Sequence, residues 1–275
     1  ALLAGDIDIA QSLPPDVART MVDSGEFNVT TKPGLSTEIV RFFPENNEAL
    51  QDVNVRRALN LAINKEEYNA IIRAGFGSPT TGQLLQPGVD GYNDDLTGFA
   101  YNPDEARRLL SEAGYANLEL SLGAPNTVRT DAETVAGYLE AIGVRVTLET
   151  PDSGSIISEL ITGTERSMIM AGAQYSTLGD WTQAMVAIDP TTLPPGAPVE
   201  FPNERFNELN QQIKLADDAE ERNALIRENA ALMRDEAAVL FLSWVDYYFV
   251  HSPQVTSMAL NLDNSPQIHS IRKVL

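Results

Sequence analysis

The chain has 275 residues, of which 43% are hydrophobic, and this is enough apolar material to bury one large domain or two lobes. Its formal net charge is −20, from 39 acidic against 19 basic residues. This excess argues against nucleic acid or an anionic membrane as the partner, because basic residues hold both. Cysteine is absent, which excludes disulfides, thiol catalysis and cysteine-ligated metals.

The opening segment, ALLAGDIDIA, has no basic region before its apolar residues, so it does not predict a signal peptide. No run of about 18 apolar residues occurs, so the sequence predicts no transmembrane span. The first residue is Ala rather than Met. Two interpretations stay open: the chain is a mature protein, or it begins inside a longer one.

In the first part of the chain the sequence predicts a strand at residues 7–10 and a helix opened by proline at residues 15–24. The segments FNVTTKPG and TEIVRFF are β-branched and aromatic and predict two strands. Asp52 is the N-cap of the next helix. Its apolar residues recur every three or four positions as one buried stripe: Val55, Ala58, Leu59, Ala62 and Ile63.

A long loop, SPTTGQLLQPGVDGYNDDLTG, follows, and loops of this length serve a function or wrap another element. The segment YNPDEARRLLSEAGY then predicts a helix with both ends marked. Asn102 is the N-cap, Pro103 occupies the first helical position, and Gly114 ends the helix in a left-handed conformation.

The next part alternates between strands and helices. The strands LELSLGAP, VRVTLE and SMIMAGA flank a helix capped by Thr130 or Asp131 and a shorter helix at residues 155–161. This order predicts parallel strands joined by right-handed crossovers.

The last part begins with a helical segment at residues 203–237, which breaks near Asp217 and Asp218. The apolar segment AVLFLSWVDYYFVHS follows as a long strand, and HSIRKVL ends the chain as another strand. No internal repeat and no low-complexity segment interrupts this order.

The motifs of the common enzyme classes are absent from the sequence. His251 and His269 have no metal-type partner two to four positions away, so each is interpreted as a satisfied or surface histidine. Gly75, Gly77 and Gly82 follow a helix rather than a strand, so they do not form a dinucleotide fingerprint. No G-x-S-x-G elbow and no P-loop occurs. The sequence predicts no catalytic residue, no metal and no cofactor.

Five segments, in order along nearly the whole chain, resemble the extracellular solute-binding proteins of family 5, the peptide- and nickel-type receptors of ABC importers. The segments are ALLAGDIDIAQSLPP, DVNVRRALNLAINKEEY, YNPDEARRLLSEAGY, LEAIGVRVTLE and DAEERNALIRENAALMRDEAAVLFL. In the first segment Gly5, Asp6 and Asp8 match the family's Gly-Glu-Ile-Asp turn, and the third segment matches its family pattern almost throughout. One such segment alone is a weak signal, whereas five in order are specific.

The resemblance implies an α/β fold: a periplasmic-binding-protein-like lobe of type II, in the large peptide-receptor class, with fragments of a second lobe. It implies that the chain is the C-terminal portion of a longer protein. Residues 1–40 would end lobe I, residues 41–239 would form lobe III, the α/β ligand-binding lobe, and residues 240–275 would return to lobe I. The chain is expected to cross between lobes near residues 39–43 and 240–244.

The resemblance also places ligand contacts in the segment AGAQYSTLGDWTQAM, after the last parallel strand. In peptide-binding members an Asp in this segment pairs with the ligand's amino terminus. An ungapped placement puts Thr177 at that Asp, and a shift of one residue puts Ser176 there. The charged amine partner is therefore missing, which leaves room for a sugar, a modified peptide or another polar solute.

Six residues are predicted to contact the ligand: Gln174, Tyr175, Thr177, Asp180, Trp181 and Trp244. An exposed aromatic side chain in a polar loop often marks a contact. The alternatives are loop capping for the polar members and a core position for Trp244. Arg56 and Arg222 match family positions and are interpreted as structural residues that hold helix ends through paired acids.

The resemblance therefore implies the substrate-binding component of an ABC importer, which captures an oligopeptide or peptide-like ligand between two lobes and delivers it to the permease. The alternatives are the same role for a non-peptide solute, such as an oligosaccharide, an opine or a metal chelate, and, less favoured, an enzyme. The expected partners are the ligand, membrane permease subunits and the missing N-terminal part of the same protein, with no nucleic acid. The expected location is periplasmic or otherwise extracytoplasmic, with or without a lipid anchor.

Overall fold

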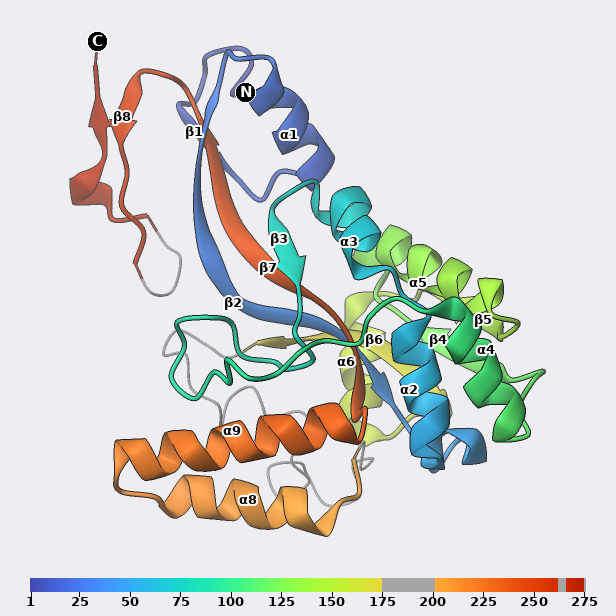
Figure 1. The fold of residues 1–275 in the computed structure, drawn as a ribbon. Helices are drawn as coiled ribbons and strands as arrows, with labels where there is room; N and C mark the ends of the chain where they lie inside the picture. Colours follow the sequence, from blue (N-terminus) through green and yellow to red (C-terminus); the bar gives the residue numbers. More distant parts are fainter. Residues whose placement is uncertain (175–200, 262–265, 275) are drawn as a thin grey trace.

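The computed structural model describes residues 1–174, 201–261 and 266–274 (Figure 1). In this part of the chain a seven-stranded sheet has the order β1-β7-β2-β6-β4-β5, β3 pairs separately with β7, and β8 and β9 form a second sheet. The strands are β1 (Ile9–Gln11), β2 (Asn28–Phe42), β3 (Gly77–Pro79), β4 (Glu119–Gly123), β5 (Arg145–Glu149), β6 (Met168–Gln174), β7 (Val239–His251), β8 (Val255–Ser257) and β9 (Arg272–Lys273).

Helices cover both faces of the large sheet. The α-helices are α1 (Pro15–Asp23), α2 (Val53–Leu61), α3 (Lys65–Tyr68), α4 (Pro103–Glu112), α5 (Arg129–Ala141), α6 (Ser153–Thr162), α8 (Glu204–Leu215) and α9 (Ala219–Asp235). The short helices are η1 (Glu48–Gln51), η2 (Asn69–Arg73), η3 (Asn126–Val128) and η4 (Ile268–Ser270), of which η2 is a π-helix and the others are 3₁₀ turns.

The long strands β2 and β7 pair antiparallel and run side by side along much of the molecule (Figure 1). The segments FNVTTKPG and TEIVRFF were predicted to form two strands. This was wrong, because they form one continuous strand, β2. Its register against β7 shifts between Pro33 and Thr37. Proline has no N–H to donate to the ladder, so an irregularity there lets one strand continue past it.

The alternating segment forms the predicted parallel strands. β4 is parallel to β5 and to β6, and α5 and α6 are the crossovers between them. The predicted caps of α5 were wrong: the helix begins at Arg129, its N-cap is Val128, and no side chain caps it. The 3₁₀ turn η3 leads directly into the helix, so Asp131 lies in the first turn and is free to contact another element.

The other predicted helix ends are confirmed. Asp52 accepts a hydrogen bond from the Asn54 N–H at 2.8 Å, and Asn102 accepts one from the Glu105 N–H at 3.0 Å. Gly114 has a φ of 86°, as a left-handed end residue requires. Near the chain end, the predicted strand is shorter than expected, because η4 precedes the two-residue β9.

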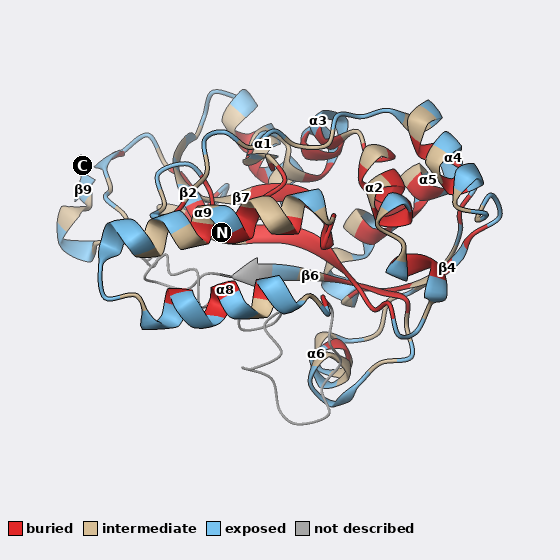
Figure 2. Cartoon of the chain, turned by 60° about the horizontal axis from the view of Figure 1, so that its bottom comes forward, coloured by how far each residue is buried: buried red, intermediate tan, exposed pale blue. Residues whose placement is uncertain are grey.

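Hydrophobic side chains fill both faces of the sheet. Val40 and Phe42 of β2 pack in the core beneath α2, α4 and α5, whereas Ile39 packs on the opposite face with residues of α8, α9 and the long loop. Figure 2 shows β7 largely in the buried colour behind α9, and its first half, Val239 to Trp244, is buried throughout. The predicted lobe boundaries, after residues 40 and 239, fall within β2 and at the start of β7 and stay a prediction.

Candidate functional site

The carboxyl ends of the parallel strands define the edge of the sheet at which a ligand is expected. In open α/β sheets, ligands bind in the crevice outside these ends. β4 ends at Gly123, which pairs with Ile169, and β6 continues beyond that point to Gln174, opposite Ser36 of β2. We call this region, with the loop and helix start after β4, the carboxyl edge.

The predicted contact segment leaves β6 at this edge. Gln174 is the last residue of β6. Tyr175, Thr177, Asp180 and Trp181 lie outside the described residues. Their contact with a ligand stays a prediction.

Trp244 lies on β7 under the long loop. Its side chain is nearly inaccessible, with 4% of the residue exposed, and its indole N–H donates to the Leu84 carbonyl at 3.2 Å. The Tyr92 ring meets it edge-on, with 6.0 Å between the ring centroids. This burial agrees with the core alternative, and a direct ligand contact for Trp244 stays a prediction.

A buried charged cluster occupies the carboxyl edge. Nη2 of Arg73 lies 2.5 Å from Oε2 of Glu38 and 3.3 Å from Oδ2 of Asp131. The exposed fractions of these side chains are 8% for Glu38 and 14% for each of the other two. The cluster joins β2, the end of η2 and the first turn of α5, and we call it the Glu38–Arg73–Asp131 cluster.

Local structure explains how the three side chains meet. Glu38 lies opposite Gly172 of β6 and Ser243 of β7, on the same face of β2 as Val40, because side chains alternate along a strand. Arg73 ends η2, and the next residue, Ala74, takes a left-handed φ of 48° that turns the chain away. The uncapped start of α5 supplies Asp131, whose charge suits a helix N-terminus.

The cluster contains two carboxylates and one guanidinium, and its surroundings shift the pKa of Asp131. Burial, and then the negative charge of Glu38, raises the pKa of Asp131 to about 7, although Arg73 opposes the shift. Tyr68 lies beside the cluster on α3, and burial, with the Glu38 charge, raises its pKa well above the usual range. Perturbed acids gathered at one edge of a sheet are typical of functional sites.

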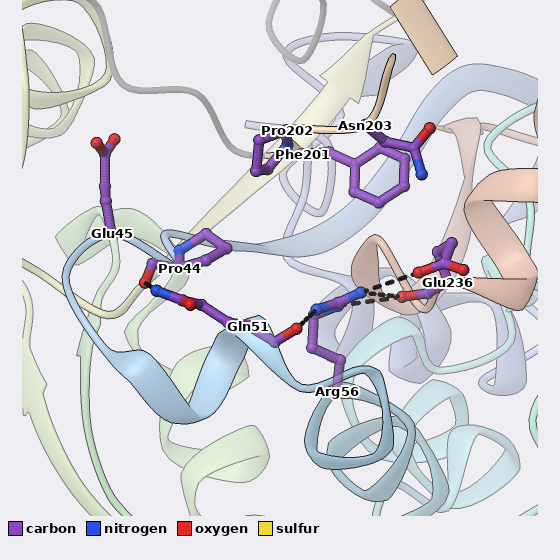
Figure 3. A pocket seen from close by; sticks show the side chains of 8 residues that line it. All are labelled: Pro44, Glu45, Gln51, Arg56, Phe201, Pro202, Asn203 and Glu236. Carbon is purple, nitrogen blue, oxygen red and sulfur yellow. Dashed lines mark hydrogen bonds and ion pairs between the residues drawn. The ribbon is translucent and has the colours of Figure 1, made fainter. Parts of the chain in front are cut away.

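A pocket of about 480 Å³ lies elsewhere, beyond the opposite end of β6 (Figure 3). Phe43, next to Pro44 of the pocket wall, donates its N–H to Ser167 at the amino end of β6, at 2.9 Å. The lining residues are Pro44, Glu45, Gln51, Arg56, Phe201, Pro202, Asn203 and Glu236. The pocket is therefore not at the edge where parallel strands present ligands.

Arg56 in this pocket is held by backbone carbonyls. Its guanidinium donates to the carbonyls of Leu50 at 2.8 Å, Gln51 at 3.0 Å and Glu236 at 2.8 and 3.0 Å. The Glu236 carboxylate adds one longer contact at 3.4 Å. Arg56 thus joins η1 to the end of α9, mainly through carbonyls rather than through the paired acid that the sequence suggested.

Within the described ranges, no group of three or more His, Asp or Glu side chains is placed to hold a metal ion. No helix in those ranges is long and apolar enough to cross a membrane.

The architecture is that of the periplasmic binding proteins, as two solved structures show. The periplasmic binding protein DppA from Helicobacter pylori, in complex with peptide STSA, matches with a TM-score of 0.84 and 20% identity, over 99% of this chain and 54% of that one. NikA from Brucella suis, in complex with Fe(III)-EDTA, gives 0.86 and 22%, over 99% and 58%. The expected α/β fold class is confirmed.

Residues 1–193 match the bacterial extracellular solute-binding proteins, family 5 (Middle), and the chain belongs to this family. It is 26% identical to the dipeptide-binding protein of Escherichia coli over 84% of this chain and 44% of that protein. It is 32% identical to di/tripeptide-binding protein 2 of Pseudomonas aeruginosa over 49% of this chain and 25% of that protein. The family expectation is confirmed, and the chain spans about half the length of the relatives it matches.

Sequence reasoning missed the Glu38–Arg73–Asp131 cluster. Each residue alone reads as an ordinary surface charge, and Arg73 and Asp131 are 58 positions apart in the sequence. One signal was available: Glu38 is a charged residue inside the strand segment TEIVRFF, on the alternation that buries Val40 and Phe42. A charge at a core-facing strand position requires a partner.

Proposed function

We propose that the complete protein is the solute receptor of an ABC importer, that it captures a peptide-like solute between two lobes, and that it delivers this solute to a membrane permease. The observation that carries the proposal is membership of the solute-binding family, over residues 1–193. The family is one of transport proteins rather than enzymes, so the proposal assigns binding without turnover. Hinged closure of two lobes on a ligand is the mechanism that this architecture uses.

The carboxyl edge is the part of this chain that we assign to the ligand. It combines the end of β6, the loop after β4 and the buried Glu38–Arg73–Asp131 cluster. In the proposed receptor, β2 and β7 would connect this lobe to the other one, because both strands continue past it along the molecule. The second lobe would come largely from sequence outside this chain.

Peptides are the favoured solutes because two relatives are named dipeptide-binding and di/tripeptide-binding proteins. A non-peptide solute is the second candidate, since related structures hold Fe(III)-EDTA and agropinic acid. For location, the family is extracellular, and we propose a periplasmic protein, with lipid anchoring as a separate property to be measured.

Thermal-shift screening of the full-length protein tests the receptor proposal. The panel contains di- and tripeptides, opines, oligosaccharides and metal chelates. A true ligand raises the melting temperature by mass action, and at 100 times its Kd it stabilises the fold by about 2.7 kcal/mol. Each hit is confirmed by calorimetric titration, with one-to-one stoichiometry expected.

Two outcomes would contradict the proposal. A full panel without any shift would argue against a solute receptor. Mass spectrometry of each recovered hit provides the second check: the solute should be unchanged, and a product formed in proportion to protein and time would identify an enzyme instead. The control is the same panel on an unrelated protein of similar acidity, which should show no selective shift.

A further inference from the structure

The charges of the Glu38–Arg73–Asp131 cluster do not balance. Two carboxylates contact one guanidinium, and all three side chains are at most 14% exposed. When both acids are ionised, the cluster carries one excess negative charge. An uncompensated charge in a poorly solvated site is costly, so the cluster favours the arrival of one more positive charge.

The groups that face the two acids do not supply that charge. Arg73 comes from η2 and Tyr68 from α3, while β7 contributes Ser243, whose hydroxyl donates to the Asn69 side chain at 2.7 Å. Within the described residues, Arg73 is the only cation that forms an ion pair with Glu38 or Asp131. Among the described residues, Tyr68 and Ser243 beside the two acids are uncharged.

Two polar groups in the cluster lack a good partner. The Tyr68 hydroxyl is fully buried and, within the described residues, forms no hydrogen bond of normal geometry. Nε of Arg73 is likewise without an acceptor in that part of the chain. Buried polar groups are nearly always satisfied in native proteins. The Tyr68 oxygen can accept a hydrogen bond from a bound donor, so it points to a species that completes the site, whereas the Arg73 Nε–H is itself a donor and needs an acceptor.

The proton is the first species that fits. Burial and the charge of Glu38 raise the pKa of Asp131 to about 7, so near neutral pH the carboxyl exchanges between its neutral and charged forms. The second is a cation from outside, and of the two acids Asp131 keeps the larger exposed fraction, 14% against 8% for Glu38. The cluster also lies at the edge where β6 ends and a ligand is expected.

We propose that the carboxyl edge selects a solute that carries an ammonium or guanidinium group, and that this group supplies the missing positive charge at Asp131 and Glu38. The inference rests on the proposed receptor function and names its substrate class. Binding of the cationic group near neutral pH replaces the proton on Asp131. That proton passes to the buffer, so cation binding and proton release are linked.

The test uses the full-length protein and matched solutes. The probes are di- and trialanine, each with its Nα-acetyl form, together with agmatine and putrescine as cationic solutes and sucrose and maltose as neutral ones. Titration calorimetry at pH 7 in two buffers with different ionisation enthalpies measures the affinity and the protons released. We expect the bound solutes to be cationic, acetylation to weaken binding about tenfold, and each binding event to release a fraction of one proton.

Two variants locate the effect. Asp131→Asn and Glu38→Gln each remove one acid, and each should weaken cationic solutes about tenfold and reduce the proton release. Glu119→Gln removes an acid at the opposite end of β4, where Glu119 pairs with exposed Arg145, and should leave both measurements unchanged. Circular dichroism checks that each variant is folded. If one of the two cluster variants does not fold, the other is sufficient for the test.

The outcomes separate this inference from the receptor proposal. If the protein binds neutral or anionic solutes and the cluster variants bind them equally well, the cationic selectivity is wrong and the receptor function stands. If cationic solutes bind with unchanged affinity in both cluster variants, the assignment to this cluster is wrong. If no solute binds, both proposals fall.

Discussion

Arg73 and Arg56 are both buried arginines, yet their partners differ in kind. Arg73 lies between two carboxylates at the carboxyl edge, whereas Arg56 donates to backbone carbonyls of three residues near the amino end of β6. Carbonyls are neutral and do not titrate, so the main partners of Arg56 have the same charge at every pH. Burial and the Glu38 charge raise the pKa of Asp131, beside Arg73, to about 7, so that site can respond to pH and to an incoming charge.

The comparison predicts that loss of Arg73 has the largest effect. Arg73→Met leaves Glu38 and Asp131 buried without their cation, and breaking a buried ion pair costs about 3–5 kcal/mol. We expect such a loss at pH 8, and a smaller one at pH 5, because Asp131, with a pKa raised to about 7, then holds a proton and only Glu38 is left without its cation. Urea unfolding of the full-length protein at the two pH values measures it.

The matched control is Arg108→Met. Arg108 also contacts two acids, Glu105 and Glu112, but on the exposed surface of α4. Its loss should be small at both pH values, because solvent screens exposed pairs. An equal loss for Arg73→Met at pH 5 and pH 8 would show that Asp131 does not take up a proton between these pH values.

Loss of Arg56 should come next and should not depend on pH in the same way. Arg56→Met leaves carbonyls of Leu50, Gln51 and Glu236 without their donor, and hydrogen bonds to a charged group contribute about 1.5–3 kcal/mol. We expect the free energy of unfolding to fall by about 2–3 kcal/mol at both pH 5 and pH 8. Solute affinity should be unchanged, since the pocket lies away from the carboxyl edge.

Arg57→Met serves as the control for Arg56→Met. Arg57 donates to the Asp235 carbonyl from an exposed position on the same helix, so its loss should cost about 1 kcal/mol or less. A change in solute affinity for Arg56→Met but not for Arg57→Met would contradict the structural role given to the Arg56 pocket.

The same contrast separates what the sequence can predict from what it cannot. The caps Asp52 and Asn102 were predictable because a cap and its N–H are two or three residues apart. The parallel strands followed from the order of strands and helices. The cap of α5 was predicted wrongly because a 3₁₀ turn started the helix early, which a local pattern of Thr130 and Asp131 does not reveal.

The candidate site could not be predicted in this way. Glu38, Arg73 and Asp131 come from three elements, and only the tertiary fold brings them together. Strand alternation marks Glu38 as a charge facing the core, but it does not identify Arg73 as the partner. The resemblance to the family placed the ligand contacts after β6. That segment leaves the same edge of the sheet at which the cluster lies, but the cluster residues come from β2, η2 and α5.

The pH dependence of the free energy of unfolding tests the Arg73 site further, with an effect smaller than the loss of Arg73. Asp131 has a pKa of about 7 in the folded chain, through burial and the charge of Glu38, against about 3.9 when unfolded. Between these values the native chain holds a proton that the unfolded chain has lost. The carboxyl therefore stabilises the fold fully below about pH 4, and this contribution is lost as the pH rises through 7.

Asp131→Asn removes this titration and keeps a neutral group of similar shape. Between pH 4.5 and 8, the stability of the variant relative to the wild type should therefore rise by about 3 kcal/mol. Urea unfolding across this range measures the difference, and Glu119→Gln, an exposed acid, should give a flat one. A flat difference for Asp131→Asn as well would contradict the raised pKa of Asp131.

Lys65 extends the comparison to a third buried cation and gives the smallest expected effect. Its ammonium donates to the carbonyls of Asn60 at 3.1 Å and Phe99 at 3.4 Å, as Arg56 does to its carbonyls, but lysine loses its proton far more readily than arginine. Burial lowers the pKa of Lys65 to about 8, against about 10.4 when unfolded.

Between pH 8 and pH 10 the unfolded chain holds a proton that native Lys65 has released, so this group makes stability rise with pH in that window and the gain disappears as the pH falls through 8. Lys65→Met loses two hydrogen bonds but also the cost of a buried charge, so at pH 7 we expect a change of about 1 kcal/mol or less. Relative to the wild type, the variant should become less stable as the pH rises from 8 to 10. A constant difference over that range would mean that Lys65 keeps its charge and that its carbonyl contacts hold it as firmly as those of Arg56 do.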